Sequence, residues 1–167
     1  MKVWKIVGPK TLSMEDEQGE LRPGYVKVKV TKLGLTSADI AVYEGQTDVS
    51  LPIVPGRIAT AVISEVNEGS RFRKGERVLL SPYMKDEKGR LYTRGLDMDG
   101  YLADYVVLPE SDVYALPESI TEDMGVFAEF AILLSLKISF PTISFTLSAP
   151  TSGTTISRKI TRGWSKT

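Results

Sequence analysis

The segments YVKVKVTKL at residues 25–33 and IATAVISEV at residues 58–66 carry the clearest structural pattern in the chain. In the first, Val26, Val28 and Val30 alternate with polar residues, so that every second side chain is apolar. Successive side chains of a β-strand point to opposite faces, and a period of two therefore predicts a strand with one buried face. The second segment is rich in β-branched residues and predicts another strand. Together they indicate an antiparallel β domain.

Glycine- and proline-containing turns recur around these two segments at intervals of roughly ten residues, as in β-barrels and sandwiches. We expect a mainly β body over residues 1–117. Residues 83–99 are polar and predict either a hairpin or a long loop. Short helices are expected at residues 37–43, capped by Ser37, and after Thr121, in a helix that includes residues 125–131. Further strands are predicted at residues 2–7, 10–15, 77–80, 100–108 and 113–116.

The composition is that of an ordinary globular protein: 167 residues, 42% apolar and 25% charged, with no net charge. Nucleic-acid binding normally shows as a basic excess, which a neutral chain does not provide. No apolar run reaches the roughly 18 residues of a membrane span, and the amino terminus lacks the apolar core of a secretory signal. We therefore expect no nucleic-acid partner, no membrane partner and a cytoplasmic location.

The sequence contains neither cysteine nor histidine. Disulfides, a thiolate nucleophile and the side chain that most often acts as acid or base near neutral pH are therefore missing. Protein zinc sites nearly always include one of these two residue types among their ligands. The composition predicts that the chain binds no zinc.

Charge is distributed unevenly along the chain. All 21 acidic residues lie at or before Glu129, whereas residues 130–167 carry five basic residues and no acidic one. Residues 131–167 are also rich in serine and threonine, yet begin with the apolar stretch AILLSLKISFPTISFTL. We predict a domain at residues 1–130 and a basic tail at residues 131–167. The tail is either a disordered extension or, as we favour, the product of a shift in reading frame.

Several segments between Met1 and about Ile132 resemble, in order, the GroES-like barrel domain of the medium-chain dehydrogenase/reductase family. They are similar to the family patterns G-I-C-G-S-D-x-H, P-x-x-x-G-H-E, V-x-E-V-G with F-x-x-G-D-R-V, and G-G-F-A-E-Y. In this chain they read GLTSADIA at residues 34–41, LPIVPGRI at 51–58, ISEV at 63–66, FRKGERV at 72–78 and GYLADY at 100–105. The resemblance implies a mainly β, GroES-like barrel with short helices, followed by an atypical tail.

The departures from these patterns fall at the zinc ligands. Thr36 stands where the zinc enzymes have a cysteine, and Ala41 replaces a histidine. Arg57 and Ile58 replace the histidine and glutamate of the second pattern, and residues 83–99 lack the cysteines of the structural zinc lobe. A guanidinium at position 57 would also repel a cation. The resemblance therefore implies a member of the family without zinc.

Five residues are candidates for the substrate cleft that the resemblance implies, and we assign none of them to catalysis, cofactor binding or metal binding. Each has a structural alternative. Thr36 suits a small packed position, Ser37 a helix cap, and Asp39 local hydrogen bonds in the loop. Arg57 either binds an anion or pairs with a carboxylate. The five candidates are Thr36, Ser37, Asp39, Arg57 and Glu129.

The functional hypothesis is an isolated substrate-side domain of a medium-chain NAD(P)-dependent alcohol dehydrogenase or related oxidoreductase, inactive alone. The G-x-G-x-x-G fingerprint of a dinucleotide-binding domain does not occur in the sequence. The alternative is a small-ligand or partner-binding module that acts with a separate nucleotide-binding domain. A co-chaperonin is a third hypothesis, against which the dehydrogenase-like segments argue. Apolar surface left by a missing domain further predicts a homo-oligomer.

Overall fold

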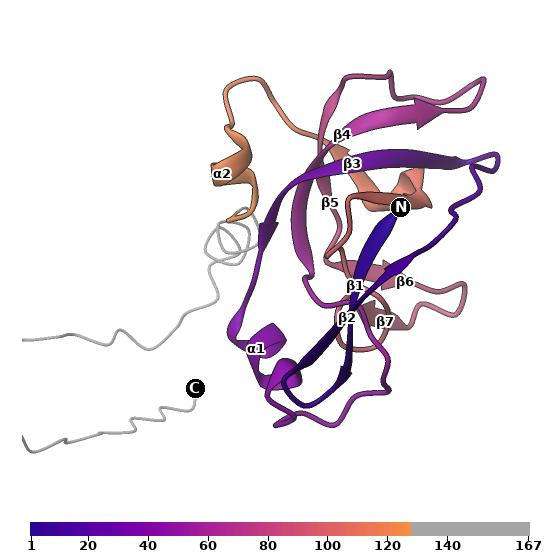
Figure 1. The fold of residues 1–167 in the computed structure, drawn as a ribbon. Helices are drawn as coiled ribbons and strands as arrows, with labels where there is room; N and C mark the ends of the chain where they lie inside the picture. The colour runs from indigo at the N-terminus through magenta and orange to yellow at the C-terminus, as the bar shows by residue number, and fades with distance from the viewer. Residues whose placement is uncertain (128–167) are drawn as a thin grey trace, which may run out of the picture. The chain divides into compact units, whose positions relative to one another are not determined.

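A five-stranded antiparallel sheet, curled around a core, forms the body of the protein in the computed structural model, which describes residues 1–127 (Figure 1). The two segments with the clearest pattern form its centre, as β3 and β4, and pair along almost their whole length. The strand order is β8-β3-β4-β5-β9. The strands are β3 (Tyr25–Gly34), β4 (Ile58–Val66), β5 (Arg77–Leu80), β8 (Tyr105–Pro109) and β9 (Val113–Ala115).

Smaller elements surround this sheet. A hairpin of β1 (Lys2–Gly8) and β2 (Thr11–Asp16) lies near the helix α1 (Ser37–Tyr43). Residues 83–99 contain a hairpin, β6 (Tyr83–Lys85) and β7 (Leu91–Thr93), which decides between the two forms expected there. A single 3₁₀ turn, η1 (Glu110–Asp112), links β8 to β9, and α2 (Glu122–Gly125) packs against β3 and β4. The mainly β, GroES-like fold is confirmed.

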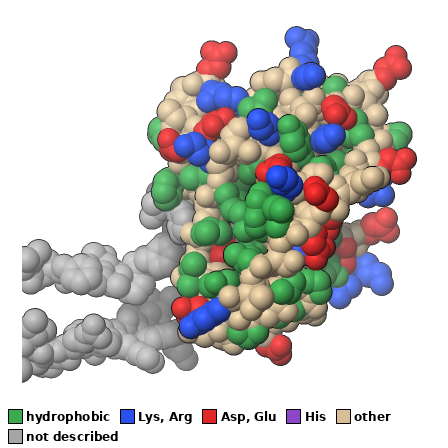
Figure 2. All heavy atoms as spheres, viewed as in Figure 1, with side chains coloured by type: hydrophobic (Ala, Val, Ile, Leu, Met, Phe, Trp, Pro, Cys, Tyr) green, Lys and Arg blue, Asp and Glu red, His purple; other side chains and the backbone are tan. Residues whose placement is uncertain are grey.

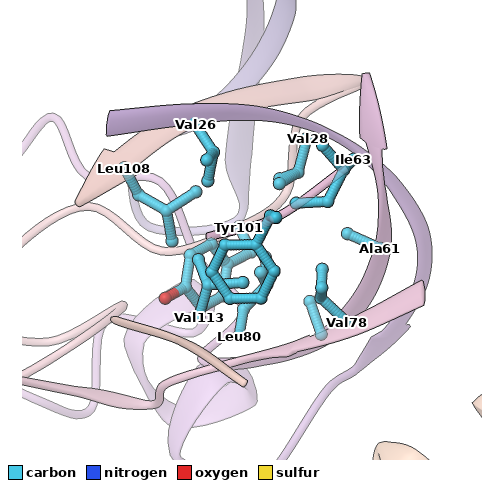
Figure 3. Close-up of a cluster of buried hydrophobic side chains, with 11 residues drawn as sticks. Val26, Val28, Ala61, Ile63, Val78, Leu80, Tyr101, Leu108 and Val113 are labelled. Atoms are coloured by element: carbon cyan, nitrogen blue, oxygen red, sulfur yellow. The ribbon is translucent and has the colours of Figure 1, made fainter. Parts of the chain in front are cut away.

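Tyr101 occupies the middle of the core, although it belongs to no strand (Figure 3). Its side chain is fully buried, and its hydroxyl donates a 2.6 Å hydrogen bond to the backbone carbonyl of Ser81. Burial raises the pKa of this phenol far above its usual value, with the nearby Arg94 guanidinium opposing the shift. The surrounding side chains come from all five strands and include Val26, Val28, Ala61, Ile63, Val78, Leu80, Leu108 and Val113.

The strand expected at residues 100–108 was wrong at its start. The ladder of β8 begins only at Tyr105, because Gly100, Tyr101 and Leu102 instead donate their backbone N–H groups to the carbonyls of residues 54–56. This crossing segment directs the Tyr101 side chain into the core. The other predicted strands are present, with boundaries that differ by at most one residue.

A buried ion pair fixes the end of the β6–β7 lobe to the sheet. Arg94 follows β7, and its Nη2 lies 3.0 Å from Oδ2 of Asp112 in η1. Both side chains are about nine-tenths buried, and Arg94 also stacks over the Tyr101 ring, 5.0 Å from its centroid. Asp112 further accepts, through its carbonyl, the backbone N–H of Ser81. Removing one partner of such a pair would leave an uncompensated buried charge.

Thr121 caps α2 as expected, because its hydroxyl accepts the backbone N–H of Met124. The continuation of that helix to residue 131, the boundary at residue 130 and the tail at 131–167 lie outside the described residues. No helix within residues 1–127 is long and apolar enough to cross a bilayer. On the face seen in Figure 2, basic and acidic side chains are interspersed, and hydrophobic side chains gather between them.

The Tyr101 hydroxyl provides a test of this core. Tyr101→Phe keeps the ring but leaves the Ser81 carbonyl buried without this donor, so we expect the free energy of unfolding to fall by about 1–3 kcal/mol. Urea unfolding followed by circular dichroism measures the change. Tyr114→Phe is the matched control because the Tyr114 side chain is exposed, and it should change stability by less than about 0.5 kcal/mol. Equal stability of the two variants would contradict this account of the core.

Candidate functional site

The Asp39 carboxylate joins the start of α1 to the loop before β4. Asp39 is only 5% exposed. Its Oδ2 accepts hydrogen bonds from the backbone N–H and the hydroxyl of Thr36, each 2.7 Å long. Its Oδ1 accepts the backbone N–H of Gly56, also at 2.7 Å. Three donors thus compensate one buried carboxylate, and two stretches 17 residues apart are held together at one point.

The local sequence explains how α1 begins here. Thr36 has extended backbone angles and is the N-cap, and Asp39, in the third helical position, accepts the N-cap N–H in the manner of a capping box. The expectation that Ser37 caps the helix was therefore wrong, because Ser37 is already the first helical residue and its side chain is exposed. The prediction that Asp39 makes local hydrogen bonds in the loop agrees with these contacts.

We call the hydrogen bonds from the Asp39 carboxylate to Thr36 and Gly56 the Asp39 clamp. Gly56 connects this clamp to the core. Its backbone has φ of 86°, the left-handed region that glycine occupies without strain. The Gly56 carbonyl accepts the N–H of Tyr101 at 2.7 Å, and the neighbouring Pro55 carbonyl accepts that of Leu102 at 3.1 Å. A Cβ on Gly100 would collide with the Pro55 and Gly56 carbonyl oxygens, so only glycine fits this approach. The candidate cleft and the core therefore share one hydrogen-bonded connection.

Arg57 follows Gly56 directly and is half-buried, whereas the next side chain, Ile58, is only 2% exposed and belongs to β4. The structure thus brings Thr36, Asp39 and the backbone N–H of Gly56, the residue before Arg57, to one place through the hydrogen bonds of the carboxylate. Ser37 lies beside them on α1. Glu129, the fifth candidate, lies outside the described residues.

The side chains at this place do not fit a zinc ion. The Thr36 hydroxyl donates to Asp39, and both carboxylate oxygens of Asp39 already accept hydrogen bonds. Ile58 offers no donor atom, and Arg57 carries a positive charge. Among residues 1–127, no three Asp, Glu, His or Cys side chains are grouped so that they could hold a metal ion. The side chains at positions 36, 57 and 58 therefore do not match the zinc ligands of the enzymes whose sequence patterns this chain resembles.

Sequence reasoning missed the second half of the clamp. The N–H of Gly56 and the crossing of residues 100–102 are backbone features, and a pattern of side chains does not reveal them. The glycines themselves were the available signal, because glycine fits a positive φ or a close backbone approach without strain. Gly56 meets the first requirement and Gly100 the second.

An apolar groove of about 220 Å³ lies next to the clamp, between the β1–β2 hairpin and α1. It was also missed, because it combines residues from five separate stretches of the chain. Asp39 is its one charged lining residue. The apolar lining includes Ile6, Leu12, Leu35, Ile40 and Leu102.

Comparison with known proteins places these features in a family. Residues 22–118 match the family model described as alcohol dehydrogenase GroES-like domain. Over 125 residues the chain is 30% identical to an L-threonine 3-dehydrogenase of Protochlamydia amoebophila, covering 62% of this chain and 36% of the relative. The chain therefore spans little more than a third of the length of this curated relative.

Solved structures show the same fold. A short chain alcohol dehydrogenase (rspB) of Escherichia coli, complexed with cofactor NADH, superposes with a TM-score of 0.68 at 29% identity, over 77% of this chain and 42% of that one. The glucose dehydrogenase of Haloferax mediterranei, in complex with NADP, Zn and gluconolactone, gives a TM-score of 0.66 at 18% identity, over 81% and 46%. At that identity the second likeness concerns the fold alone.

The Asp39 clamp can be tested by a change of one atom type. Asp39→Asn replaces one acceptor oxygen with an NH₂ group that faces an N–H donor, so we expect a loss of about 1.5–3 kcal/mol in the free energy of unfolding. Chemical denaturation measures it. Asp48→Asn, at an exposed loop position, is the control and should leave stability unchanged. A loss no larger than that of the control would show that the clamp does not stabilise the fold.

Proposed function

Because this chain belongs to the family of alcohol dehydrogenase GroES-like domains, we propose that it is the substrate-side domain of an NAD(P)-dependent oxidoreductase of the medium-chain type. The family match over residues 22–118 carries this proposal. The relatives named above are an L-threonine 3-dehydrogenase, an alcohol dehydrogenase and a glucose dehydrogenase, so the reaction we propose for the assembled enzyme is oxidation of an alcohol or reduction of a carbonyl.

Zinc takes no part in this proposal. The residues at positions 36, 57 and 58 supply a hydroxyl already directed at Asp39, a guanidinium and an alkyl group. We propose instead that Arg57 is the group that contacts the substrate, because a guanidinium can donate hydrogen bonds to a carbonyl or carboxylate oxygen. Asp39 and Thr36 serve as positioning residues, since they fix the loop that carries Arg57. No group is assigned to proton or hydride transfer.

The proposed reaction requires a nucleotide-binding domain, whose characteristic features do not occur in residues 1–127. Dinucleotide-binding domains are built from parallel strands joined by helices, with a glycine-rich turn at the phosphate. All named strands in residues 1–127 pair antiparallel, and the G-x-G-x-x-G pattern is missing from the sequence. We propose that the partner is a separate nucleotide-binding domain and that the chain has no dehydrogenase activity without it.

An activity assay tests this dependence. The purified chain, given NAD or NADP and a panel of small alcohols, should produce no nicotinamide absorbance change above the blank. A full-length relative, such as the Escherichia coli rspB protein, serves as the positive control in the same assay. Turnover by the chain alone would refute the proposal, and activity that appears only after addition of a nucleotide-binding protein would support it.

Introducing zinc-ligand side chains at positions 36, 57 and 58 tests the hypothesis that this chain binds no zinc. Wild-type chain should show no zinc binding by calorimetry at micromolar concentrations. The triple variant Thr36→Cys, Arg57→His, Ile58→Glu supplies a thiolate, an imidazole and a carboxylate, and should gain zinc affinity. The matched control Thr36→Val, Arg57→Gln removes the hydroxyl and the positive charge without adding strong donors, and should not bind. Stoichiometric zinc in the wild-type chain would contradict the hypothesis.

A further inference from the structure

Thr60 is fully buried, although its side chain lies on the face of the sheet that points away from the core. In β4 the side chains of residues 59, 61 and 63 belong to the core cluster. Because successive side chains of a strand point to opposite faces, Ile58 and Thr60 lie on the outer face. Both are nonetheless at most 2% exposed. Other parts of the chain therefore cover the outer face of β4.

Part of this cover comes from residues 117–127, which we call the strap. The strap contains α2, which lies beside β3 and β4 (Figure 1). A Cβ added to Gly125 would lie 2.6 Å from Cγ2 of Thr60, so the bare glycine backbone rests on this side chain. In the same way, a Cβ added to Gly34 would lie 3.6 Å from Cβ of Val126. The strap thus packs against the end of β3 and the outer face of β4.

Polar contacts attach the strap to the sheet. The Arg77 guanidinium, at the start of β5, donates hydrogen bonds to three backbone carbonyls of the strap, as its planar fork of donors allows. The acceptors are the carbonyls of Pro117 and Glu118, each 3.3 Å from Nη2, and that of Ile120, 3.2 Å from Nη1. The Lys32 ammonium also lies 3.1 Å from the Asp123 carboxylate, but both side chains are at least half exposed and such a pair contributes little. Arg77 is therefore the main attachment.

The strap contributes no side chain to the two hydrophobic clusters of residues 1–127. Its large apolar side chains are instead exposed, 56% at Met124 and 64% at Phe127. Detaching the strap would therefore expose little additional apolar surface, whereas unfolding the sheet would expose the whole core. A segment attached in this way opens at a lower free energy than the fold as a whole.

We propose that residues 117–127 form a strap that opens as a unit while the sheet stays folded, and that Arg77 holds it closed. Opening uncovers Thr60 and the end of β4 that begins directly after Arg57. The strap is therefore a movable wall beside the candidate site, and its position can change while the Asp39 clamp stays intact. The opening is defined by contacts within this chain and does not depend on the proposed oxidoreductase reaction.

A buried thiol beneath the strap tests this opening, since the chain has no cysteine of its own. In the full-length chain, Thr60→Cys places a thiol under Gly125, and Val78→Cys places one in the core, where Val78 is also fully buried. Iodoacetamide reacts with each thiol only when it is uncovered, so the rate, followed by mass spectrometry, reports the open population. Thr60→Cys should react at least about tenfold faster than Val78→Cys.

Second substitutions separate opening of the strap from global unfolding. Tyr101→Phe weakens the core and leaves the strap contacts intact, so it should speed the reaction of Val78→Cys at least about fivefold and that of Thr60→Cys by less than about twofold. Arg77→Gln removes the guanidinium fork and should speed the reaction of Thr60→Cys about tenfold. Arg73→Gln is the matched control, because it removes the same charge from an exposed side chain and should have little effect.

Hydrogen exchange provides the same comparison without a thiol, should either cysteine variant not fold. The Gly125 N–H bonds to the Thr121 carbonyl within the strap, and the Ile63 N–H bonds to the Glu76 carbonyl within the sheet, each at 2.9 Å. Tyr101→Phe should speed exchange at the Ile63 amide and leave exchange at the Gly125 amide unchanged.

Three results would overturn the proposal. Equal reaction rates of Thr60→Cys and Val78→Cys, or equal acceleration of both by Tyr101→Phe, would mean that the strap opens only when the whole domain unfolds. An effect of Arg77→Gln no larger than that of Arg73→Gln would mean that the guanidinium does not hold the strap. No substrate or cofactor enters these measurements, so their failure would leave the proposed oxidoreductase function untouched.

Discussion

The hydrogen bond from the Gly56 N–H to the Asp39 carboxylate is the contact on which the candidate site depends. Burial of a carboxylate is costly unless donors replace its water, and here Thr36 supplies the other two. The same Gly56 gives its carbonyl to Tyr101, whose ring fills the core. Local order at the start of α1, the conformation of the loop and the packing of the sheet are thus linked through one residue, Gly56.

This linkage supports the proposal of a family member that does not use zinc. In the described residues the Asp39 clamp holds the two stretches that carry positions 36 and 57, and it requires no cation. In the β6–β7 lobe, the buried pair of Arg94 and Asp112 similarly fixes the chain to the sheet. Hydrogen bonds and one ion pair therefore supply cross-links at these two places, which supports the proposal that the side chains at positions 57 and 58 do not coordinate a metal.

The sequence predicts those parts of the fold that depend on side-chain periodicity. Residues 25–33 and 58–66 became β3 and β4 because alternating burial has a period that can be counted. Residues 100–104 resembled a strand equally well, yet their backbone bonds go to residues 54–56, which no local pattern encodes. The cap was misplaced by one residue for a related reason: Thr36 and Ser37 are both good caps, and the distant Gly56 contact holds Asp39 where it bonds Thr36.

The two faces of the β1–β2 hairpin differ in charge, and this difference fixes how its strands pair. On the face of Ser13, the Lys5 ammonium lies 2.9 Å from the Glu15 carboxylate and 2.6 Å from that of Glu17. Hydrogen bonds to these carboxylates raise the pKa of Lys5, so this face remains charged at any physiological pH. On the opposite face, Leu12 and Met14 are apolar. A slip of one residue between β1 and β2 would exchange these two faces, so the register that pairs Lys5 with Ser13 keeps the Lys5 ion pairs together on one face and the apolar side chains on the other.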